Sequence, residues 1–454
     1  MSVQLIGGSA LTTARKGMST TAMNIANAAT PGYSRQRLEQ AALAPANPQR
    51  LTSGQGVETV GIRRMADQFL QQQVWYGTTR QHYAQQLQLG LNALEKTVSS
   101  EQSGIASGLD NLFQSLSAAT EKPDNQALRQ NVLSNAKGMA LRFNTLQHYL
   151  QKQHSDIRQQ QQSIMAQANS LLAQLAGLNE KITAGQALGH LSPELRDRRD
   201  ERVSDLSELI AIRINEQPDG SLQISLPEGH PLVSGSYPAQ LVLDREAAGG
   251  IKIRFSGSEW KTGLAKGGEL GALQDFLTQT LQPVEQASSA MAEALATHIN
   301  LQLASGFDLR GQPGAALFDF NAQRSTGMMQ VTDLGWEGLA FSQDARANGD
   351  NRNLLQLSNI KHQRFPFAHL GVTTLDNASV SLSGELGIQS QQNQHELDSA
   401  RLLLHEVKTQ RDSYSAVDYD EEYIDLTRYT QAYQAGMQVV STGDRLFGDL
   451  LALF

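Results

Sequence analysis

Histidines beside carboxylates are the first residues in this chain whose chemistry could be catalytic, and their spacing decides what they can do. His395-Glu396 and His405-Glu406 both fall in a predicted helix. A zinc protease helix carries two His four residues apart with a Glu directly after the first, and each pair here lacks the second His. We therefore interpret both pairs as ordinary exposed helix residues.

Two clusters of side-chain oxygens are the next candidates. One is rich in carboxylates and amides, but its spacing does not match a calcium-binding loop. It consists of Asp344, Asn348, Asp350 and Asn351. The other is an acidic group at the start of a predicted helix, where negative charge complements the helix dipole. It consists of Asp418, Asp420, Glu421 and Glu422. We expect neither cluster to bind a metal or to be catalytic.

The common nucleotide-binding and nucleophile motifs are absent from the sequence. Gly54-x-Gly56 lacks the third glycine of a dinucleotide fingerprint, and no Gly-Lys dipeptide marks a P-loop. There is no G-x-S-x-G elbow, and the absence of cysteine excludes thiol catalysis and disulfides. We predict a protein that is not an enzyme and that has no cofactor and no metal.

Composition and charge exclude further classes. The chain has 454 residues and a net charge of −8, so it has room for two to four domains and lacks the basic excess of a nucleic-acid-binding protein. No apolar run approaches the roughly 18 residues that span a bilayer, and we expect no membrane partner. Arg15 and Lys16 come too late for a cleaved secretory signal, so we expect any secretion to use another route.

The clearest structural signals lie at the two ends of the chain. Residues 5–29 predict a helix of small residues that ends at Pro31-Gly32, and residues 419–454 predict a long helix capped by Asp418. Apolar residues recur at helical spacing on one face of each. On the first helix they are Leu11, Ala14, Met18, Thr21, Ile25 and Ala28. On the second, with two polar interruptions, they are Tyr423, Leu426, Thr430, Tyr433, Met437, Val440, Asp444, Phe447, Leu451 and Phe454. We expect the two helices to pair as in a coiled coil.

Between these ends the periodicity changes twice. Residues 66–209 read as helices. They carry a heptad stripe through Leu150, Ile157, Ile164, Leu171 and Leu178, with Ala168, Leu175 and Ile182 between them. Short β-type segments separated by glycine turns follow from 210, and helical patterns return at 270–303, 350–360 and 376–414. The sequence predicts a mainly α fold with a β-rich insertion. We expect three domains: 1–65 with 417–454, a helical bundle of 66–209 with 346–416, and an outer β-rich domain of 210–345.

The predicted terminal pair has little apolar surface of its own. One narrow seam packed on an N-terminal helix weakened by Gly17 gives marginal stability in isolation. Tyr419, Tyr429, Val439 and Leu446 lie off that seam and are available to other subunits. We therefore interpret both ends as assembly elements that are disordered in the free monomer.

Both ends also resemble a known family. The run NIANAATPGYSR at 24–35 resembles the N-I-A-N-x-x-T-x-G-Y-x-R signature of flagellar rod, hook and hook-associated proteins, and SGQGV at 53–57 resembles the G-x-G-V step after it. DEE at 420–422 and YTQAYQA at 429–435 resemble the ending of the same family. The candidate signature and assembly residues are Asn24, Ile25, Asn27, Thr30, Gly32, Tyr33, Arg35, Gly54, Gly56, Leu426, Tyr433, Met437, Val440, Phe447 and Leu451.

Segments in the middle of the chain resemble the branch of that family that forms the hook–filament junction. They are LRDRRD at 195–200, GFD at 306–308, LF at 317–318 and NGDNRN at 348–353. The resemblance implies an extracellular structural protein of the bacterial flagellum, exported by the flagellar type III pathway without a cleaved signal. It implies four partners: further copies of the chain in an axial polymer, the hook protein, the next hook-associated protein on the filament side, and a cytoplasmic export chaperone at the C-terminal region.

Two alternatives stay open at this point. The first is another axial structural protein, such as hook or distal rod, although the long helical region 66–210 is unlike hook protein. The second is an exported wall-degrading enzyme carried on axial ends. It would need a carboxylate or metal constellation within 210–345, and the few acids there show no such spacing.

Overall fold

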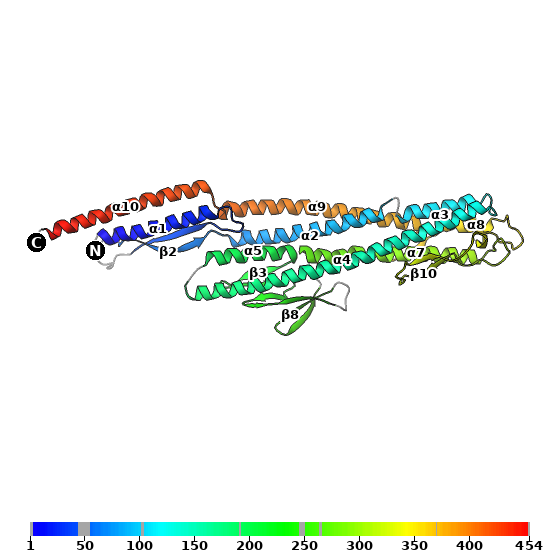
Figure 1. The fold of residues 1–454 in the computed structure, drawn as a ribbon, viewed down its shortest axis with the longest axis horizontal. Coiled ribbons are helices and arrows are strands. Elements are labelled where there is room, and N and C mark those ends of the chain that lie inside the picture. The colour runs from blue at the N-terminus through cyan, green and yellow to red at the C-terminus, as the bar shows by residue number, and fades with distance from the viewer. Residues whose placement is uncertain are drawn as a thin grey trace.

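The molecule is a long, mainly helical rod with both ends of the chain at the same end of the rod (Figure 1). The computed structural model describes residues 3–43, 55–100, 104–189, 192–244, 250–262, 266–368 and 370–452. Helices dominate, the terminal helices pair, and short antiparallel sheets form within the middle of the chain. The predicted fold class is therefore confirmed.

The first and last helices form what we call the terminal unit, together with one hairpin. Helix α1 (Val3–Asn27) lies against α10 (Tyr419–Leu451), and the antiparallel strands β1 (Gln36–Ala42) and β2 (Val57–Arg64) pack beneath α1. Figure 1 places this unit at one end of the rod, beyond the longer helices. Everything between β2 and α10 is called the body below.

Long helices form the body. Their bounds are α2 (Gln68–Val98), α3 (Ile105–Ala119), α4 (Gln126–Ala187), α5 (Pro193–Leu209), α6 (Gly268–Asp275), α7 (Gln282–Ala304) and α9 (Leu375–Ser415), with a π-helical segment, Phe276–Leu281, joining α6 to α7. Helix α2 packs along α9, so segments that are some 300 residues apart in sequence lie side by side. The side chain of Asn393 donates to the carbonyl oxygen of Ala84 at 2.8 Å and fixes their register.

Helix α4 is the longest element, with 62 residues, and its buried stripe differs from the predicted heptad. The stripe runs through Ile157, Gln161, Ile164, Ala168, Leu172, Leu175, Asn179 and Ile182, so Ile157, Ala168 and Asn179 recur every 11 residues. One line of the predicted heptad is wrong beyond Ile164, because Leu171 and Leu178 are only partly buried, whereas the residues predicted between them, Ala168, Leu175 and Ile182, are buried. An 11-residue repeat has 3.67 residues per turn, close to the 3.6 of a straight helix, so α4 keeps one face buried along this stretch.

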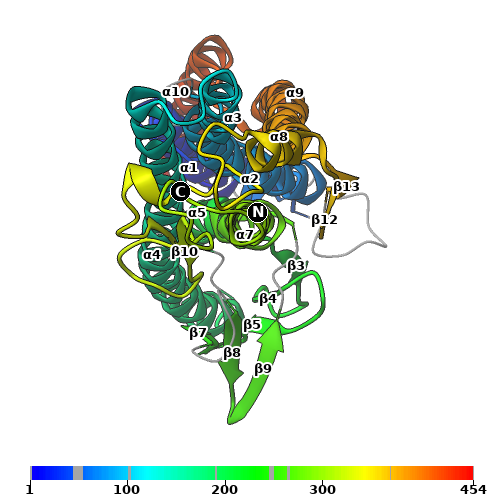
Figure 2. The ribbon, with the colours of Figure 1, turned by 90° about the vertical axis from the view of Figure 1, so that its right-hand side faces the viewer.

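Two small antiparallel sheets project from the side of α4 (Figure 2). The first has the order β3–β4–β5–β6, and the second has the order β7–β8–β9. Their bounds are β3 (Arg213–Glu216), β4 (Leu222–Ser225), β5 (Pro231–Ser234), β6 (Tyr237–Pro238), β7 (Gln240–Leu243), β8 (Ile251–Phe255) and β9 (Ser258–Thr262). The turn predicted at Asp219-Gly220 joins β3 to β4, and Gly220 has φ +79° there.

The predicted outer domain of 210–345 needs a correction. Helices α6 and α7, at 268–304, pack against α2, α4 and α9 and are part of the helical body. They bury apolar side chains on several faces, including Leu270, Phe276, Leu281 and Leu295, and a helix of that kind needs neighbours all around it. The helical body therefore resumes at 268 rather than at 346, and the lateral sheets span only 213–262.

Short elements close the far end of the rod. They are β10 (Phe318–Phe320), β11 (Met329–Val331), α8 (Arg352–Asn359), β12 (Phe365–Phe367) and β13 (Gly371–Thr373), with single 3₁₀ turns at Trp336–Gly338 and Ile360–His362. Arg129 of α4 is buried among them. It donates to the carbonyl oxygens of Trp336 and Leu339 at 3.2 and 2.7 Å, and burial lowers its pKa to about 10, which nearby Asp124 and Asp308 offset only in part.

The oxygen-rich segment around Asp350 also has a structural role at this far end. Asp350 accepts hydrogen bonds from the backbone N–H of Gln343 at 2.7 Å and from the guanidinium of Arg352 at 2.9 Å. Asn351 donates to the carbonyl oxygen of Thr120 at 2.9 Å, and the buried Asn353 donates to that of Ala340. These side chains therefore connect the loop that precedes α8 to the C-terminal end of α3.

The apolar core lies almost wholly in the body. One continuous cluster of buried apolar side chains extends through the helices, the lateral sheets and the far end. Among the described residues of the terminal unit, only Ala14, Leu38 and Tyr429 are buried apolar side chains. Other interactions must therefore hold the terminal unit together.

Candidate functional site

Glycines bring α1 and α10 together. Gly7 and Gly17 on α1, and Gly436 and Gly443 on α10, are all buried at the contact. A Cβ atom on Gly17 would overlap the ring of Tyr429, and one on Gly7 would lie 2.7 Å from Cγ2 of Val440. The helices approach so closely because these positions carry no side chain.

This packing divides the predicted C-terminal seam into two parts. Leu426, Tyr433 and Val440 are half-buried, whereas Met437, Phe447 and Leu451 are 46%, 57% and 62% exposed. The innermost positions are instead Tyr429, Gly436 and Gly443, which recur every seven residues. Tyr429 had been predicted to lie off the seam, and it is the most buried large apolar residue of α10. Counting glycine as a contact residue would have located this face.

Asn24 is the hydrogen-bonding centre of the N-terminal signature. Its amide nitrogen donates to the carbonyl oxygen of Gln36 at 2.8 Å and to a carboxylate oxygen of Glu422 at 3.0 Å. Its amide oxygen accepts from the hydroxyl of Tyr33 at 2.9 Å and from the N–H of Gln36 at 3.0 Å. One buried side chain thus connects α1, the loop after it, β1 and α10.

Arg35 joins the same network to the start of α10. Its Nε donates to Glu422 at 2.6 Å, it forms an ion pair with Glu421, and it lies 3.7 Å from Asp425. Burial alone would lower the pKa of Arg35, but Glu421 and Glu422 together raise it. Glu422 is 1% exposed, so the acidic cluster pairs with the partly buried guanidinium of Arg35 and accepts from the amide of Asn24, as well as complementing the dipole of α10.

The remaining N-terminal signature residues shape the turn that carries Tyr33 and Arg35. Asn27 donates to the carbonyl oxygen of Met23, and the hydroxyl of the exposed Thr30 donates to Asn27. Gly32 has φ +77°, which favours glycine. Ile25 is half-buried on α1.

Of the two glycines in the predicted G-x-G-V step, the structure describes only Gly56. Gly56 has φ +111°, and a Cβ atom there would overlap the hydroxyl of Ser9, so it lets the hairpin approach α1. Gly54 lies outside the described residues.

The LRDRRD segment of α5 links this network to the body. Asp197 accepts from the N–H of Ser34 at 3.2 Å and from Nε of Arg64 at 2.6 Å, and Asp200 accepts from the same guanidinium at 2.7 Å. Arg199 continues the chain of contacts, donating to the carbonyl oxygen of Gly220 at 2.8 Å. We call the contacts among Tyr33, Ser34, Arg35, Arg64, Asp197, Asp200 and Glu422 the joint.

The joint is partly removed from water. Burial raises the pKa of Asp197 above its ordinary value, an effect that Arg64 counteracts only in part. Burial, followed by the charges of Asp197, Glu194 and Glu422, raises the pKa of Tyr33 to about 12. Arg64 was not among the predicted residues, because its partners lie 133 and 136 positions away in the chain and no local pattern marks the pair.

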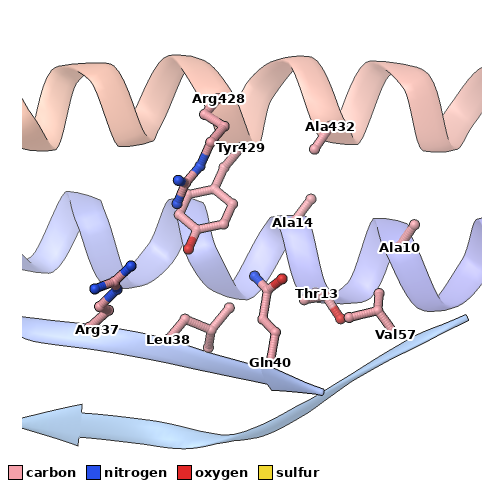
Figure 3. A pocket seen from close by; sticks show the side chains of 10 residues that line it. All are labelled: Ala10, Thr13, Ala14, Arg37, Leu38, Gln40, Val57, Arg428, Tyr429 and Ala432. Carbon is pink, nitrogen blue, oxygen red and sulfur yellow. The ribbon is translucent and has the colours of Figure 1, made fainter. Parts of the chain in front are cut away.

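A cavity of about 500 Å³ opens within the terminal unit, between α1, β1 and α10 (Figure 3). Ala14 and Leu38 contribute to its apolar lining, and Arg37 and Arg428 stand at its edge. In the described part of the chain, no three His, Asp or Glu side chains gather as a metal site would require. Nor does any helix in that part have the length and apolar character to cross a membrane.

The geometry thus describes a glycine-packed terminal unit joined by charged hydrogen bonds to a helical body, and comparison with known proteins gives it a family. A model described as the flagellar hook-associated protein FlgK helical domain matches residues 91–318, half of the chain. The chain belongs to the FlgK family of flagellar hook-associated proteins. That region holds the lateral sheets and most of the body helices, so the body carries the features that identify the family.

Two further matches fall on the terminal unit. Residues 5–33 match the flagella basal body rod protein, and residues 409–453 match the flagellar basal body rod FlgEFG protein C-terminal. These spans contain α1 with its signature turn and α10. This chain therefore combines ends typical of rod and hook proteins with a body typical of its own family.

Curated relatives agree with this assignment, and a solved structure shares the fold. The chain is 26% identical to flagellar hook-associated protein 1 of Bacillus subtilis (strain 168), with 97% of this chain and 96% of that protein covered. It is 22% identical to the protein of the same name from Escherichia coli (strain K12), with 98% of each covered. The flagellar hook junction protein FlgK of Burkholderia pseudomallei shares the fold, with a TM-score of 0.65, 17% identity, and 75% of this chain and 99% of that one covered.

Proposed function

We propose that this protein is a non-enzymatic structural subunit of the bacterial flagellum that joins the hook to the filament. Membership of the FlgK family supports this role over that of a hook or distal rod protein. The observation that carries it is the combination on one chain of rod-type ends and a FlgK body. The charged and oxygen-rich clusters described above are occupied by internal hydrogen bonds and ion pairs, which supports a structural rather than an enzymatic use.

The assembly surface in this proposal is the exposed apolar side of α10. Met437, Phe447 and Leu451 point away from α1 or extend beyond it, and Tyr423 and Ile424 are exposed as well. Leu426, Tyr433 and Val440 occupy the side toward α1 and support that surface from behind. A helix with apolar residues on both sides needs partners on both sides, and α1 provides only one.

We keep the division into domains as part of the proposal, with the border moved as described above. The terminal unit of 1–65 and 417–454 forms the axial polymer, and the helical body of 66–209 and 268–416 extends away from it. The lateral sheets of 213–262 form the β-rich insertion. We also propose that the terminal unit orders on assembly and is disordered in the free monomer, because it buries so few apolar side chains.

The partners follow from this role. They are further copies of the chain, the hook protein on one side and the next hook-associated protein on the other. We propose that the chain reaches the outside of the cell through the flagellar type III pathway, without a cleaved signal, and functions there. A cytoplasmic chaperone that covers the apolar C-terminal helix before export is consistent with its exposed side chains.

Deletion of the gene tests the proposal. We expect cells that assemble hooks, lack filaments and release filament protein into the medium, seen by electron microscopy and by blotting the medium. Expression of the full chain should restore filaments and swimming. Cells without hooks would point instead to a rod or hook protein, and normal filaments would contradict the proposal.

A further inference from the structure

The cavity of the terminal unit has a mixed lining, in which Thr13 and Gln40 are polar, and a positive edge. Its apolar lining comes from Ala10, Ala14, Leu38, Val57, Ala432 and the ring of Tyr429. Figure 3 shows Arg428 beside that ring and Arg37 reaching up from β1 on the same side. At about 500 Å³, the cavity is large enough for the side chains of a short helical segment.

The positive charge at this edge is only partly neutralised. Arg37 makes no ion pair and no hydrogen bond with any part of the chain that the structure describes, and its cross-strand neighbour is another arginine, Arg63. Arg428 pairs with Asp425 at 3.1 Å but remains 59% exposed. A partly apolar pocket with a free guanidinium at its edge suits an apolar segment that carries a carboxylate.

The end of α10 is such a segment. Helix α1 begins opposite Gly443, where a Cβ atom would lie 3.0 Å from the side chain of Gln4. Beyond that point Asp444, Phe447 and Leu451 follow at steps of three and four, so they share one face. Phe447 and Leu451 are exposed, and the carboxylate of Asp444 accepts a hydrogen bond from the side chain of Gln4. We call these three residues the knob.

We propose that the knob of one copy enters the cavity of a second copy, with Phe447 and Leu451 against the apolar lining and Asp444 facing Arg37. This inference rests on the proposed function, because it identifies how the assembly surface meets its neighbour. Charge complementarity between Asp444 and the positive edge favours a second copy as the occupant.

A knob cannot enter the cavity of its own chain. Tyr429 and Phe447 lie 18 residues apart on one continuous helix, or about 27 Å. The contact therefore joins two different surfaces of two copies. Such a head-to-tail contact repeats from copy to copy, and it generates a ring or an open helical array.

Engineered cysteines test this contact without interference, because the chain has none of its own. Gln40 lines the cavity, and Gly448 lies beside the knob with open space around it. The double variant replaces both with cysteine, Gln40→Cys and Gly448→Cys. A disulfide needs Cα atoms within about 7 Å, so this pair can form only between copies. In flagella from a deletion strain that expresses the double variant, mild oxidation should give a ladder of covalent multimers that reduction removes.

The matched control replaces Gly448→Cys with Gly384→Cys, an equally open glycine on α9, and should give no ladder. As a second measurement, Arg37→Asp and Asp444→Arg should each reduce swimming at least several-fold, and the double variant should restore it. Restored filaments with neither a ladder nor charge-reversal rescue would overturn the docking and leave the proposed function standing. Failure of the unmodified chain to restore filaments would instead overturn the proposed function.

Discussion

The body and the terminal unit of this chain are held together by different means. The body has a continuous apolar core that extends over α2 to α9, whereas the terminal unit buries three apolar side chains among its described residues. In place of a core, the terminal unit has glycine contacts, the hydrogen bonds of Asn24 and the ion pairs of Arg35. The difference indicates that burial of apolar surface stabilises the body, while specific polar contacts hold the terminal unit together.

The strongest test of this difference places a charge on α10. Val440→Asp puts a carboxylate against Gly7 at the contact between α1 and α10, and Met437→Asp puts one in the proposed assembly surface. A buried, unpaired charge costs several kcal/mol, so we expect loss of filament attachment with an unchanged melting temperature of the body. Swimming and melting are measured on the same variants. Normal swimming would remove α10 from the assembly surface, and early melting would place it in the core of the monomer.

Limited proteolysis of the free monomer separates the two regions directly. Segments with few buried apolar contacts open at low free energy and are cut first. We expect rapid trimming of both ends and a resistant fragment of roughly 60–410, identified by mass spectrometry. Ends that resist cleavage in a verified monomer would show that the polar contacts suffice without neighbours.

A large-to-small substitution in the body should lower the stability of the body itself, unlike a charge placed on α10. Leu295→Ala in α7 removes a fully buried side chain and should lower the free energy of unfolding of the body by about 2–5 kcal/mol. Leu301→Ala, on the exposed face of the same helix, is the matched control and should change it by less than about 0.5 kcal/mol. Urea titration measures both. Equal effects would mean that the core does not run through α7.

Within the terminal unit, two asparagines of the same signature should differ. Asn24→Ala removes the partner of Gln36, Tyr33 and Glu422 together, whereas Asn27→Ala removes only local contacts with Met23 and Thr30. Leaving buried polar groups unpaired costs about 1–3 kcal/mol. We expect isolated flagella with Asn24→Ala to lose filaments at a lower temperature than those with Asn27→Ala. Identical thermal behaviour would contradict a central role for Asn24.

The smallest expected effect is the acid sensitivity of the far end of the body. Arg352, followed by the N–H of Gln343, holds the pKa of Asp350 well below its usual range. Because the pKa in the folded protein is depressed, the stability from Asp350 is present above its unfolded value of about 3.9 and is lost as pH falls below it. Asp350→Asn should therefore reduce the loss of body stability between about pH 4 and pH 2. Urea midpoints across that range measure it, and parallel curves for both proteins would refute the assignment.

Sequence patterns predicted the two regions with unequal success, and the reason is physical. Helices such as α9 and α10, and the β3–β4 turn at Asp219-Gly220, follow from local periodicity and turn chemistry. The heptad line through Leu171 and Leu178 failed because heptad and 11-residue repeats share their positions from Ile157 to Ala168 and diverge only at the next step. The assignment of 268–304 to an outer domain failed because local apolar content does not say which neighbours a helix meets.

The contacts of the joint were even harder to predict from local sequence patterns. Resemblance marked Asn24, Arg35, Glu422 and Asp197 one by one, but not their contacts, because Glu422 lies 398 positions from Asn24 and Arg64 lies 133 positions from Asp197. Ion pairs over such separations have no periodic signal. The contact face of α10 was missed because two of its positions are glycine, which an apolar pattern does not count.

The length of α4 gives the joint a mechanical meaning. Its 62 residues form a strut of about 93 Å, which runs from the neighbourhood of the joint to the far end of the rod (Figure 1). A tilt of about 5° at one end of such a strut moves the other end by about 8 Å, since displacement grows with length. A small change in the hydrogen bonds of Arg64 with Asp197 and Asp200 would therefore shift the far end of the rod by a much larger distance.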